Sequence, residues 1–353
     1  MKNLIDKLFY KHNLSEHDLK YLIQNIQKKD YDYLFSKARE MRKIYYGNDV
    51  YLRGLIEITN YCKNDCYYCG IRRSNSNITR YRMETNQIIN SCEYGYNLGI
   101  RSFVLQGGED AFYTDDKLLE IIKSIKCKYP SCALTLSLGE RSYESYKKLR
   151  EAGVDRYLLR HESANEAHYR KLHPKELSLR NRMTCLENLK KLGFQTGCGF
   201  MVGSPFQSID CIVDDLMFIK QFNPEMVGIG PFIPHKDTPF SAEKQGDLYR
   251  VLLMLALVRL FLPRVLLPST TALSTIAENG MELGLLAGAN VIMPNITANE
   301  YVDNYILYNK MKKNKYSEEK LMELSLRLEK IECKIATSRG DYNKYTNREV
   351  ELT

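Results

Sequence analysis

The chain contains no apolar run long enough to span a lipid bilayer. Its longest apolar run, residues 251–262, is interrupted by Arg259. The first residues also lack the apolar stretch that a secretory signal peptide requires. With 44% hydrophobic and 27% charged residues in a length of 353, the composition is that of a folded soluble protein. We therefore expect a cytoplasmic protein that does not bind membranes.

The sequence has no dense cluster of basic residues either. Its formal net charge is +8, but the lysines are spread along the chain. This distribution favours a solvated lysine-rich surface over a nucleic-acid-binding face, which would gather its basic residues on one side. We expect no nucleic-acid partner, although a modest positive field would help to capture an anionic substrate.

A secreted disulfide scaffold is not expected despite the ten cysteines, because the chain is long and shows no secretory signal. Seven of the cysteines are scattered, and such residues usually behave as small buried hydrophobic groups. These seven are Cys92, Cys127, Cys132, Cys185, Cys198, Cys211 and Cys333.

The other three, Cys62, Cys66 and Cys69, form a C-x3-C-x2-C pattern directly after the β-branched run 55–59. Three close thiolates can hold three corners of a cubic iron–sulfur cluster, whereas most clusters take four protein thiolates. The fourth iron is then open to a substrate or cofactor. The alternative is a structural zinc site, but zinc usually takes four ligands in paired spacing, and no second Cys/His pair has comparable spacing. The pattern favours a cluster used in chemistry.

Between residues 49 and 310, short apolar or β-branched runs alternate with amphipathic helical patterns such as 85–98 and 178–192. Strands that each precede a helix predict an α/β fold, a (β/α)8 TIM-type barrel. A doubly wound open sheet is the alternative. The eight expected strands are Tyr51–Thr59, Ser102–Gln106, Ala133–Leu138, Arg156–Arg160, Thr196–Val202, Met226–Ile229, Val265–Pro268 and Asn290–Met293.

Helical segments are expected on both sides of the barrel. Residues 1–48 predict an N-terminal helical segment in which Ser15 caps a helix. A lysine-rich polar break follows residue 310, and Ser317 then begins another predicted helix. We therefore expect three parts: 1–48, the barrel 49–310, and a short helical tail 311–353.

Barrel enzymes place their chemistry at the C-terminal ends of the strands, and glycines or polar residues recur there. They are Gly107, Gly108 and Glu109 after the second strand, Thr135 and Ser137 in the third, Arg160 and Glu162 in the fourth, and Thr270 and Thr271 after the seventh. Glu109 is suited to a ligand ammonium group. Buried charges are costly unless paired, so Arg160 and Glu162 predict either a bound ligand or a mutual salt bridge.

Glycines and one arginine add to this pattern. Strand five contains Gly197 and Gly199, and Gly228 and Gly230 flank Ile229 after strand six. Glycine weakens a strand unless another group approaches the backbone, so these residues predict a flat ring lying there or close packing between elements. Arg180 stands in the first turn of a helix, where a cation opposes the helix dipole, which suggests that it grips a carboxylate.

The cysteine pattern, with Tyr68 before the last cysteine, resembles the signature of the radical S-adenosylmethionine (SAM) superfamily. The resemblance implies a [4Fe–4S] cluster on Cys62, Cys66 and Cys69, with SAM bound to the open iron. It also implies an enzyme that reductively cleaves SAM to methionine and a 5′-deoxyadenosyl radical.

Longer motifs resemble the HydE family of [FeFe]-hydrogenase maturases within this superfamily. The similarity runs through residues 1 to 310, and its motifs lie at 68–75, 104–110, 135–140, 155–162, 228–235 and 289–295. It implies a cysteine-bound Fe(CO)2(CN) unit, a small anionic species, as the substrate. It also implies partner maturases and an electron donor.

The same resemblance implies roles for individual residues. Glu109, with Gly107 and Gly108, would bind the SAM amino group, and Glu162 and Arg180 would hold its ribose and carboxylate. Tyr68, Ser137, Met201 and Ile229 are further expected cofactor contacts. The residues expected to line the substrate cavity are Arg53, Gln106, Thr135, Arg160, Thr270, Thr271 and Tyr305.

Some members of the family carry a second iron–sulfur site near the C-terminus, but here the tail from 310 has only Cys333, so we expect none. Other radical SAM enzymes, of the methylornithine synthase or biotin synthase type, remain alternatives. Biotin synthase chemistry would need further cluster ligands that the chain lacks. A carrier or scaffold for iron–sulfur clusters is the non-enzymatic alternative, but it would not explain the charged, glycine-lined strand ends.

Overall fold

The computed structural model describes residues 1–309 and 316–342. Its central feature is a six-stranded parallel sheet in the order β2-β3-β4-β5-β6-β8. Each of these strands begins near a predicted one and runs toward the same end of the molecule. The strands are β2 (Gly54–Thr59), β3 (Ser102–Gly107), β4 (Ala133–Ser137), β5 (Arg156–Leu158), β6 (Gln195–Cys198) and β8 (Met226–Val227).

Further parallel contacts close this sheet into a barrel. Residues 265–268 bridge β8 through Leu266 and bridge β10 (Val291–Ile292) through Pro268. β10 pairs in turn with β1 (Asp49–Leu52), which continues into β2. The circuit of eight segments is therefore complete, so the predicted (β/α)8 barrel is confirmed and the open sheet is excluded.

Two predicted strands differ in detail. The run 196–202 is interrupted at Gly199, where a Cβ atom would lie 2.0 Å from the Gly228 carbonyl oxygen. After this break, β7 (Met201–Val202) pairs with β9 (Gly230–Pro231) above the barrel wall. Gly199 thus allows two segments of the protein to pack closely. This is the alternative to the expected binding of a flat ring on the backbone. The seventh strand is held by single bridges only, because Pro268 has no N–H to donate.

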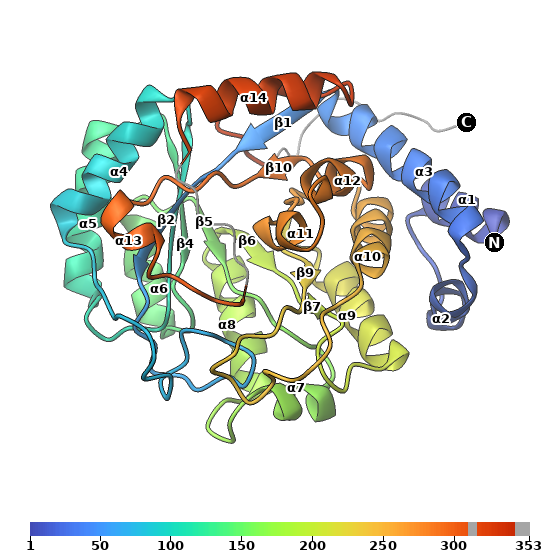
Figure 1. The fold of residues 1–353 in the computed structure, drawn as a ribbon, viewed down its shortest axis with the longest axis horizontal. Coiled ribbons are helices and arrows are strands. Elements are labelled where there is room, and N and C mark those ends of the chain that lie inside the picture. The colour runs from blue at the N-terminus through green and yellow to red at the C-terminus, as the bar shows by residue number, and fades with distance from the viewer. Residues whose placement is uncertain (310–315, 343–353) are drawn as a thin grey trace.

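Helices surround the strands (Figure 1). α10 is apolar on every side because α3 covers its outer face, which explains the long apolar run 251–262. The helices of the barrel are α4 (Thr85–Asn97), α5 (Asp115–Lys128), α6 (Tyr143–Glu151), α7 (Glu166–Leu172), α8 (Leu179–Lys191), α9 (Ile209–Phe222), α10 (Leu248–Phe261), α11 (Thr271–Ile276), α12 (Gly280–Leu286) and α13 (Asn299–Val302).

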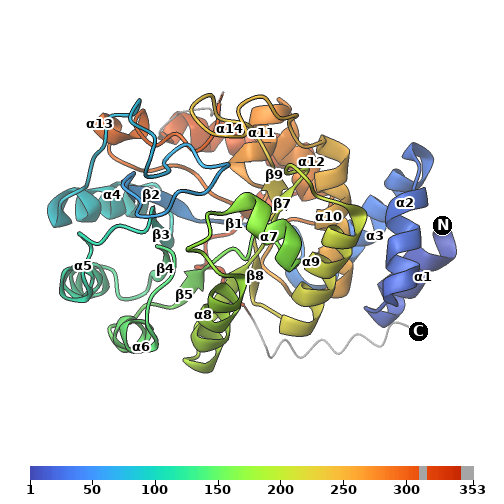
Figure 2. The same cartoon turned by 90° about the horizontal axis from the view of Figure 1, so that it is seen from below.

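The N-terminal residues form α1 (Lys2–Lys11), α2 (Glu16–Asn25) and α3 (Lys28–Tyr46). Ser15 caps α2 by accepting a hydrogen bond from the Asp18 N–H, as the sequence predicts. Figures 1 and 2 both show these helices at the side of the barrel opposite α4 and α5. No helix among the described residues is both long and apolar enough to cross a membrane.

The tail closes the lower end of the barrel, where the strands begin. α14 (Glu318–Glu329) runs along the outside of the barrel (Figure 1) and contacts β11 (Lys334–Ile335), which pairs with β1. Beyond it, Arg156 donates hydrogen bonds to the carbonyl oxygens of Arg339 and Gly340 and to Asp341. The boundaries at residues 48 and 310 stay a prediction, and residues 311–315 and 343–353 of the expected tail lie outside the described part.

Candidate active site

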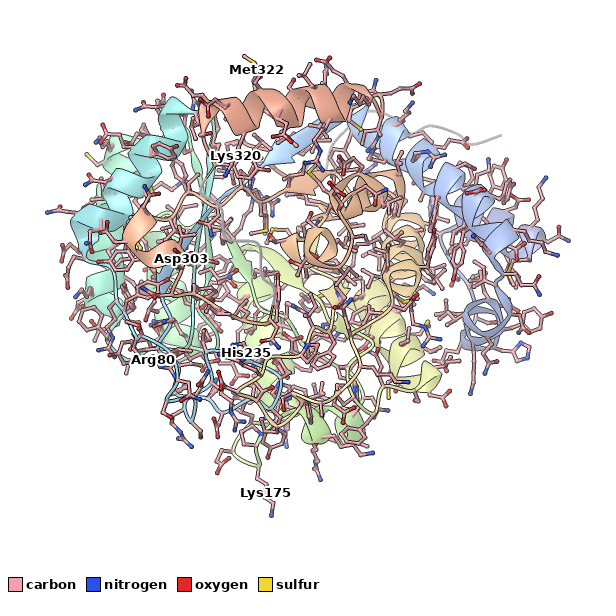
Figure 3. All side chains as sticks on the ribbon, viewed as in Figure 1. Arg80, Lys175, His235, Asp303, Lys320 and Met322 are labelled. Atoms are coloured by element: carbon pink, nitrogen blue, oxygen red, sulfur yellow. The ribbon has the colours of Figure 1, made fainter. Side chains whose placement is uncertain are left out.

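The segment after β2 carries the cysteine pattern and folds around Arg80 (Figure 3). The Arg80 guanidinium donates hydrogen bonds to the backbone carbonyl oxygens of Asn60, Ile71, Arg72 and Asn75. Carbonyl groups from both sides of the cysteine pattern thus converge on one cation, and Arg80 closes the loop. The sequence pattern does not single out Arg80, because these contacts exist only once the loop has folded.

Further contacts fix the turn between the first two cysteines. Asp65 accepts hydrogen bonds from Arg72 Nε at 2.7 Å and from the Ser74 N–H at 3.0 Å. The hydrogen bond from Arg72 lowers the pKa of Asp65, so this carboxyl group stays charged. The Gly70 N–H donates to the Leu307 carbonyl at 2.8 Å and joins the loop to the segment after α13.

The residues Cys62, Cys66 and Cys69 are half-buried, and their thiols form no disulfide. Burial raises the pKa of Cys62, and it raises the pKa of Cys69 to about 12. Burial also raises the pKa of Cys66, and the two neighbouring thiols raise it further. Three thiolates can lie together here only if cations offset their charge, which the irons of a cluster would do. The loop therefore fits the expected [4Fe–4S] cluster.

The zinc alternative fits less well. Within residues 1–309 and 316–342, no three His, Cys, Asp or Glu side chains lie close enough together to hold a single metal ion. A structural zinc site would require such convergence on one ion. A cubic cluster instead distributes its thiolates over separate irons, so a wider spacing suits it.

The end of β3 packs against the cysteine loop. At Gly108 a Cβ atom would lie 2.2 Å from the Tyr61 carbonyl oxygen and 2.7 Å from Cys62 Cβ. Any larger residue would push the two segments apart. The sequence predicts that Gly107 and Gly108 let a ligand approach the backbone closely. The structure shows that at Gly108 the cysteine loop makes this close approach.

Glu109 lies beside this contact and lines a cleft of about 270 Å³ together with Lys63 and Arg141. Its Oε1 accepts a hydrogen bond from the Glu140 N–H at 3.0 Å. Its Oε2 lies 3.1 Å from Lys63 Nζ, although only 9% of the Glu109 side chain is exposed. A shielded carboxylate that already faces an ammonium group suits the amino group of a ligand.

Arg160 and Glu162 form the mutual salt bridge that the sequence allows, with Arg160 Nη2 3.0 Å from Glu162 Oε2. Arg160 Nε has no hydrogen-bond partner among the described residues. Glu162 has a positive φ of 64°, and its N–H donates to the Gly199 carbonyl at 3.0 Å. A bulky residue held in the left-handed region costs free energy and often marks a functional site.

A buried histidine and aspartate support the Glu162 backbone. His161 Nδ1 accepts a hydrogen bond from the Gly199 N–H at 3.2 Å, so its proton lies on Nε2, 3.3 Å from Asp215 Oδ1. Burial lowers the pKa of His161 to about 3, which keeps the ring neutral. Asp215 also accepts a hydrogen bond from the Ala164 N–H at 2.5 Å. These contacts hold the chain on both sides of Glu162.

Helix α8 brings Arg182 to this site and leaves Arg180 exposed. Arg182 Nη1 donates to the Arg160 carbonyl at 2.6 Å, and its Nε donates to Glu140 Oε1 at 2.5 Å. Arg180 forms no ion pair or hydrogen bond with another described residue. The sequence argument from the helix dipole selects Arg180; the buried cation beside Glu162 and the cysteine loop is Arg182, which that argument missed.

Tyr68 lies in a small buried cluster beside the cysteines. Its hydroxyl donates to His173 Nε2 at 3.1 Å, because His173 Nδ1 donates to the Tyr169 carbonyl. Burial raises the pKa of Tyr68 well above its usual value, and Glu162 and the cysteines raise it further. Met201 of β7 packs in the same cluster. Tyr68 and Met201 are thus close to the loop, as expected.

Ser137 and Ile229 are less informative. Ser137 ends β4, where it lies opposite Gln106 in the strand register. Ile229 is fully buried in the main hydrophobic core. We find no contact in the structure that links Ile229 to the cysteine loop among the described residues, so its expected role with the cofactor stays a prediction.

The barrel interior contains buried polar groups without partners. Arg53 contacts Met226 across the barrel, with Nη1 2.9 Å from the sulfur, but its Nε and Nη2 have no hydrogen-bond partner among the described residues. The same holds for the hydroxyl groups of Thr135 and Thr270. Burial lowers the pKa of Arg53, and the nearby Arg156 cation adds to the effect. A guanidinium and hydroxyls in this state suit an anion.

The other expected cavity residues separate into two places. Tyr305 is buried, and its hydroxyl lies 3.4 Å from Gln106 Nε2. Burial raises the pKa of Tyr305 most, and the charges of Glu57 and Cys69 raise it further. The effect of Cys69 indicates that Tyr305 lies near the cysteines. Thr271 instead lines a separate cavity of about 290 Å³, beside α14 and together with Met281. Thr271 thus lines a different cavity from the barrel interior, in which the Thr270 hydroxyl group lies.

Comparison with known proteins places this geometry in a family. The model of the radical SAM superfamily matches residues 56–219. The [FeFe] hydrogenase maturase subunit HydE of Thermotoga maritima is 50% identical over 275 residues, which cover 78% of this chain and 78% of that protein. A 3-methylornithine synthase of Methanosarcina acetivorans is 29% identical over 305 residues, 85% of each chain.

The crystal structure of methylornithine synthase (PylB) has the same fold, with a TM-score of 0.84 and 26% identity over 94% of this chain and 97% of that one. Radical SAM enzymes of this kind use a [4Fe–4S] cluster and SAM, which the cysteine loop fits. The identity to HydE is much higher than that to the synthase and extends over most of both chains. The chain therefore belongs to the HydE family of radical SAM enzymes.

Proposed function

We propose that this protein acts in the maturation of [FeFe]-hydrogenase, on a small anionic organometallic substrate of the cysteine-bound Fe(CO)2(CN) type held inside the barrel. The observation that carries the proposal is the set of buried, unpartnered polar groups on Arg53, Thr135 and Thr270. Burying such groups without partners costs free energy, so they are expected to meet a polar ligand.

Residues at the barrel mouth are proposed to hold the cofactors. Cys62, Cys66 and Cys69 would bind the cluster, and the Arg80 contacts would keep their loop folded. Together with SAM, the reduced cluster supplies a 5′-deoxyadenosyl radical. Glu109 would take the SAM amino group in exchange for the Lys63 ammonium group that now faces it.

The charged residues beside it would hold the rest of SAM. Glu162 is proposed to bind the ribose hydroxyls, because its backbone is fixed and its carboxylate lies at the mouth. Arg182 would bind the carboxylate in place of Arg180, since it is the arginine that contacts this group of residues. Tyr305, which contacts Gln106, would orient the substrate and exclude water together with it.

Partners and location are proposals as well. A protein of this function would exchange substrate or product with partner maturases, would need an electron donor, and would work in the cytoplasm. The relatives and the described helices agree with these points. The expected lack of a second cluster stays a prediction, since part of the tail lies outside the described residues; its Cys333 is buried.

Hydrogenase maturation in an extract that lacks HydE tests the proposal. Adding the anaerobically reconstituted protein with SAM should restore hydrogen evolution, and the Thr270→Val variant should restore less, since it cannot hydrogen-bond the anion. SAM cleavage without any maturation would contradict the proposal and favour the methylornithine synthase alternative, which ornithine-type substrates would then test directly.

A further inference from the structure

The turn that ends strand β7 presents an aromatic ring to solvent in an unusual way. Phe206 is 58% exposed, and its φ is +66°. A bulky aromatic residue in the left-handed region is an outlier, and exposure of its ring is a second cost. Glycine would remove both costs. The conformation of Phe206 therefore suggests that its ring is needed on the surface.

The turn holds Phe206 rigidly in this position. Gln207 Oε1 accepts a hydrogen bond from the Gly203 N–H at 2.6 Å, and Gln207 Nε2 donates to the Met201 carbonyl at 2.8 Å. His168 Nε2 lies 3.1 Å from the Pro205 carbonyl oxygen. Contacts on both sides of the ring thus fix the backbone, so the exposed ring is already ordered before any partner binds.

Ring contacts connect Phe206 to the cysteine loop. The Phe206 and Phe240 centroids are 6.2 Å apart, and those of Phe240 and Tyr67 are 6.1 Å apart. Tyr67 is bonded directly to Cys66. We name Phe206, Phe240 and Tyr67 the aromatic face; it leads from the protein surface to a proposed cluster ligand.

A lysine lies against the exposed end of the aromatic face, and further basic residues stand on neighbouring segments. Lys171 Nζ lies 5.0 Å from the centre of the Phe206 ring. Lys171 at the end of α7, Lys175 in the segment after it and Arg73 in the cysteine loop are exposed, and none forms an ion pair with another described residue. Figure 3 shows Lys175 pointing away from the body of the molecule. An aromatic anchor beside unpaired cations suits an acidic protein surface.

We propose that the aromatic face is the docking site of a small acidic one-electron carrier protein that reduces the cluster. This inference rests on the proposed function, because reductive SAM cleavage needs one electron at the cluster for each SAM. The carrier loses that electron and the cluster accepts it, with no bond made or broken in this step. Docking at Tyr67 gives the electron a short path to the cluster ligands.

Two variants test the proposal with an acidic ferredoxin as the probe. Phe206→Gly removes the anchor and should raise the KM for reduced ferredoxin about tenfold, while 5′-deoxyadenosine formation with dithionite stays unchanged. Its melting temperature should be equal or higher, because glycine accepts a positive φ. Lys171→Glu should raise the same KM, mainly at low salt. Lys147→Glu, an exposed lysine on α6, is the matched control and should change neither rate.

Binding of oxidised ferredoxin, measured without SAM, separates this inference from the proposed function. Weaker binding by Phe206→Gly than by the wild type would support docking even if the protein failed to mature hydrogenase. Equal binding and an unchanged KM in both variants would overturn the proposal. Loss of self-association in Phe206→Gly, with ferredoxin binding unchanged, would also overturn it and make the aromatic face a contact between copies of the chain.

Discussion

Arg156, at the start of β5, and Arg160, just after its end, have opposite hydrogen-bonding states. At the lower end, the Arg156 side chain donates hydrogen bonds to Ser102, to Gln195, to two carbonyl groups of the tail and to Asp341. Toward the mouth, Arg160 and Thr270 keep polar atoms that have no hydrogen-bond partner among the described residues. The Arg156 side chain is thus satisfied within the protein, whereas the second set of polar atoms is available for the proposed ligands.

This difference indicates that the lower end of the barrel contributes mainly to stability and the mouth mainly to function. Satisfied polar groups at the lower end tie the tail to the strands, so they should matter for folding. Unsatisfied groups near the mouth should matter little for folding and strongly for ligand binding. Substitutions at the two ends can test this division, because each substitution is expected to change either stability or ligand binding and to leave the other property unchanged.

The largest expected effect is at the cysteine loop. Cys66→Ala should abolish both the visible absorbance of the cluster and SAM cleavage after anaerobic reconstitution, because two thiolates cannot hold the cluster in its open-iron form. Cys127→Ala, an exposed cysteine on α5, is the control and should keep both. Retained SAM cleavage in the Cys66 variant would refute the proposed ligand set.

At the lower end, Arg156→Gln should reduce the free energy of unfolding by about 3 kcal/mol, because it leaves the buried Gly340 carbonyl without its donor and removes one of the cations that face Asp341. Denaturant unfolding measures this loss. The KM for SAM should stay within about twofold of the wild-type value when it is calculated per folded molecule. A large rise in KM without loss of stability would break the division between the two ends.

These two cases show what the sequence could and could not predict. The cysteine pattern and the alternation of strands and helices are local, so they could be recognised directly. The contact of Arg156 with Asp341 joins residues far apart in the chain, and no periodicity marks it. The break at Gly199 was missed because glycine in a strand also fits an uninterrupted strand next to a ligand.

Arg182 could have been found. It follows Leu179 by three positions and precedes Leu186 by four, so it lies on the apolar face of α8. A charged residue on that face must be paired inside the protein or face a ligand. Arg180 lies on the exposed face of the same helix. Helical phase is therefore a better guide here than position relative to the helix dipole.

The third prediction concerns the mouth of the barrel and compares Arg182 with Arg180. Arg182→Gln should weaken SAM binding about 100-fold, because it removes a buried cation beside Glu162. Arg180→Gln, two residues away, should change binding by less than about twofold, as expected of an exposed side chain. Equilibrium binding of SAM to the reconstituted protein measures both, and the reverse order would restore Arg180 as the SAM ligand.

The smallest expected effect concerns the Thr270 hydroxyl group. It tests most selectively whether a polar group lacks a partner in the protein. Thr270→Val should change the free energy of unfolding by less than about 0.5 kcal/mol, because the hydroxyl it removes has no protein partner. Thr59→Val should cost about 1–2 kcal/mol, because the Thr59 hydroxyl donates to Asp110 at 2.9 Å and accepts from the Tyr61 N–H. Equal losses in the two variants would mean that the Thr270 hydroxyl is already satisfied.

The most direct test of the whole account is the amount of 5′-deoxyadenosine formed by the reconstituted protein with SAM and dithionite under anaerobic conditions. The account predicts that it forms with the wild type and with Arg156→Gln in proportion to folded protein, and that it is absent with Cys66→Ala. Its absence with a wild-type protein that carries an intact [4Fe–4S] cluster would contradict the account and leave a cluster carrier as the better explanation.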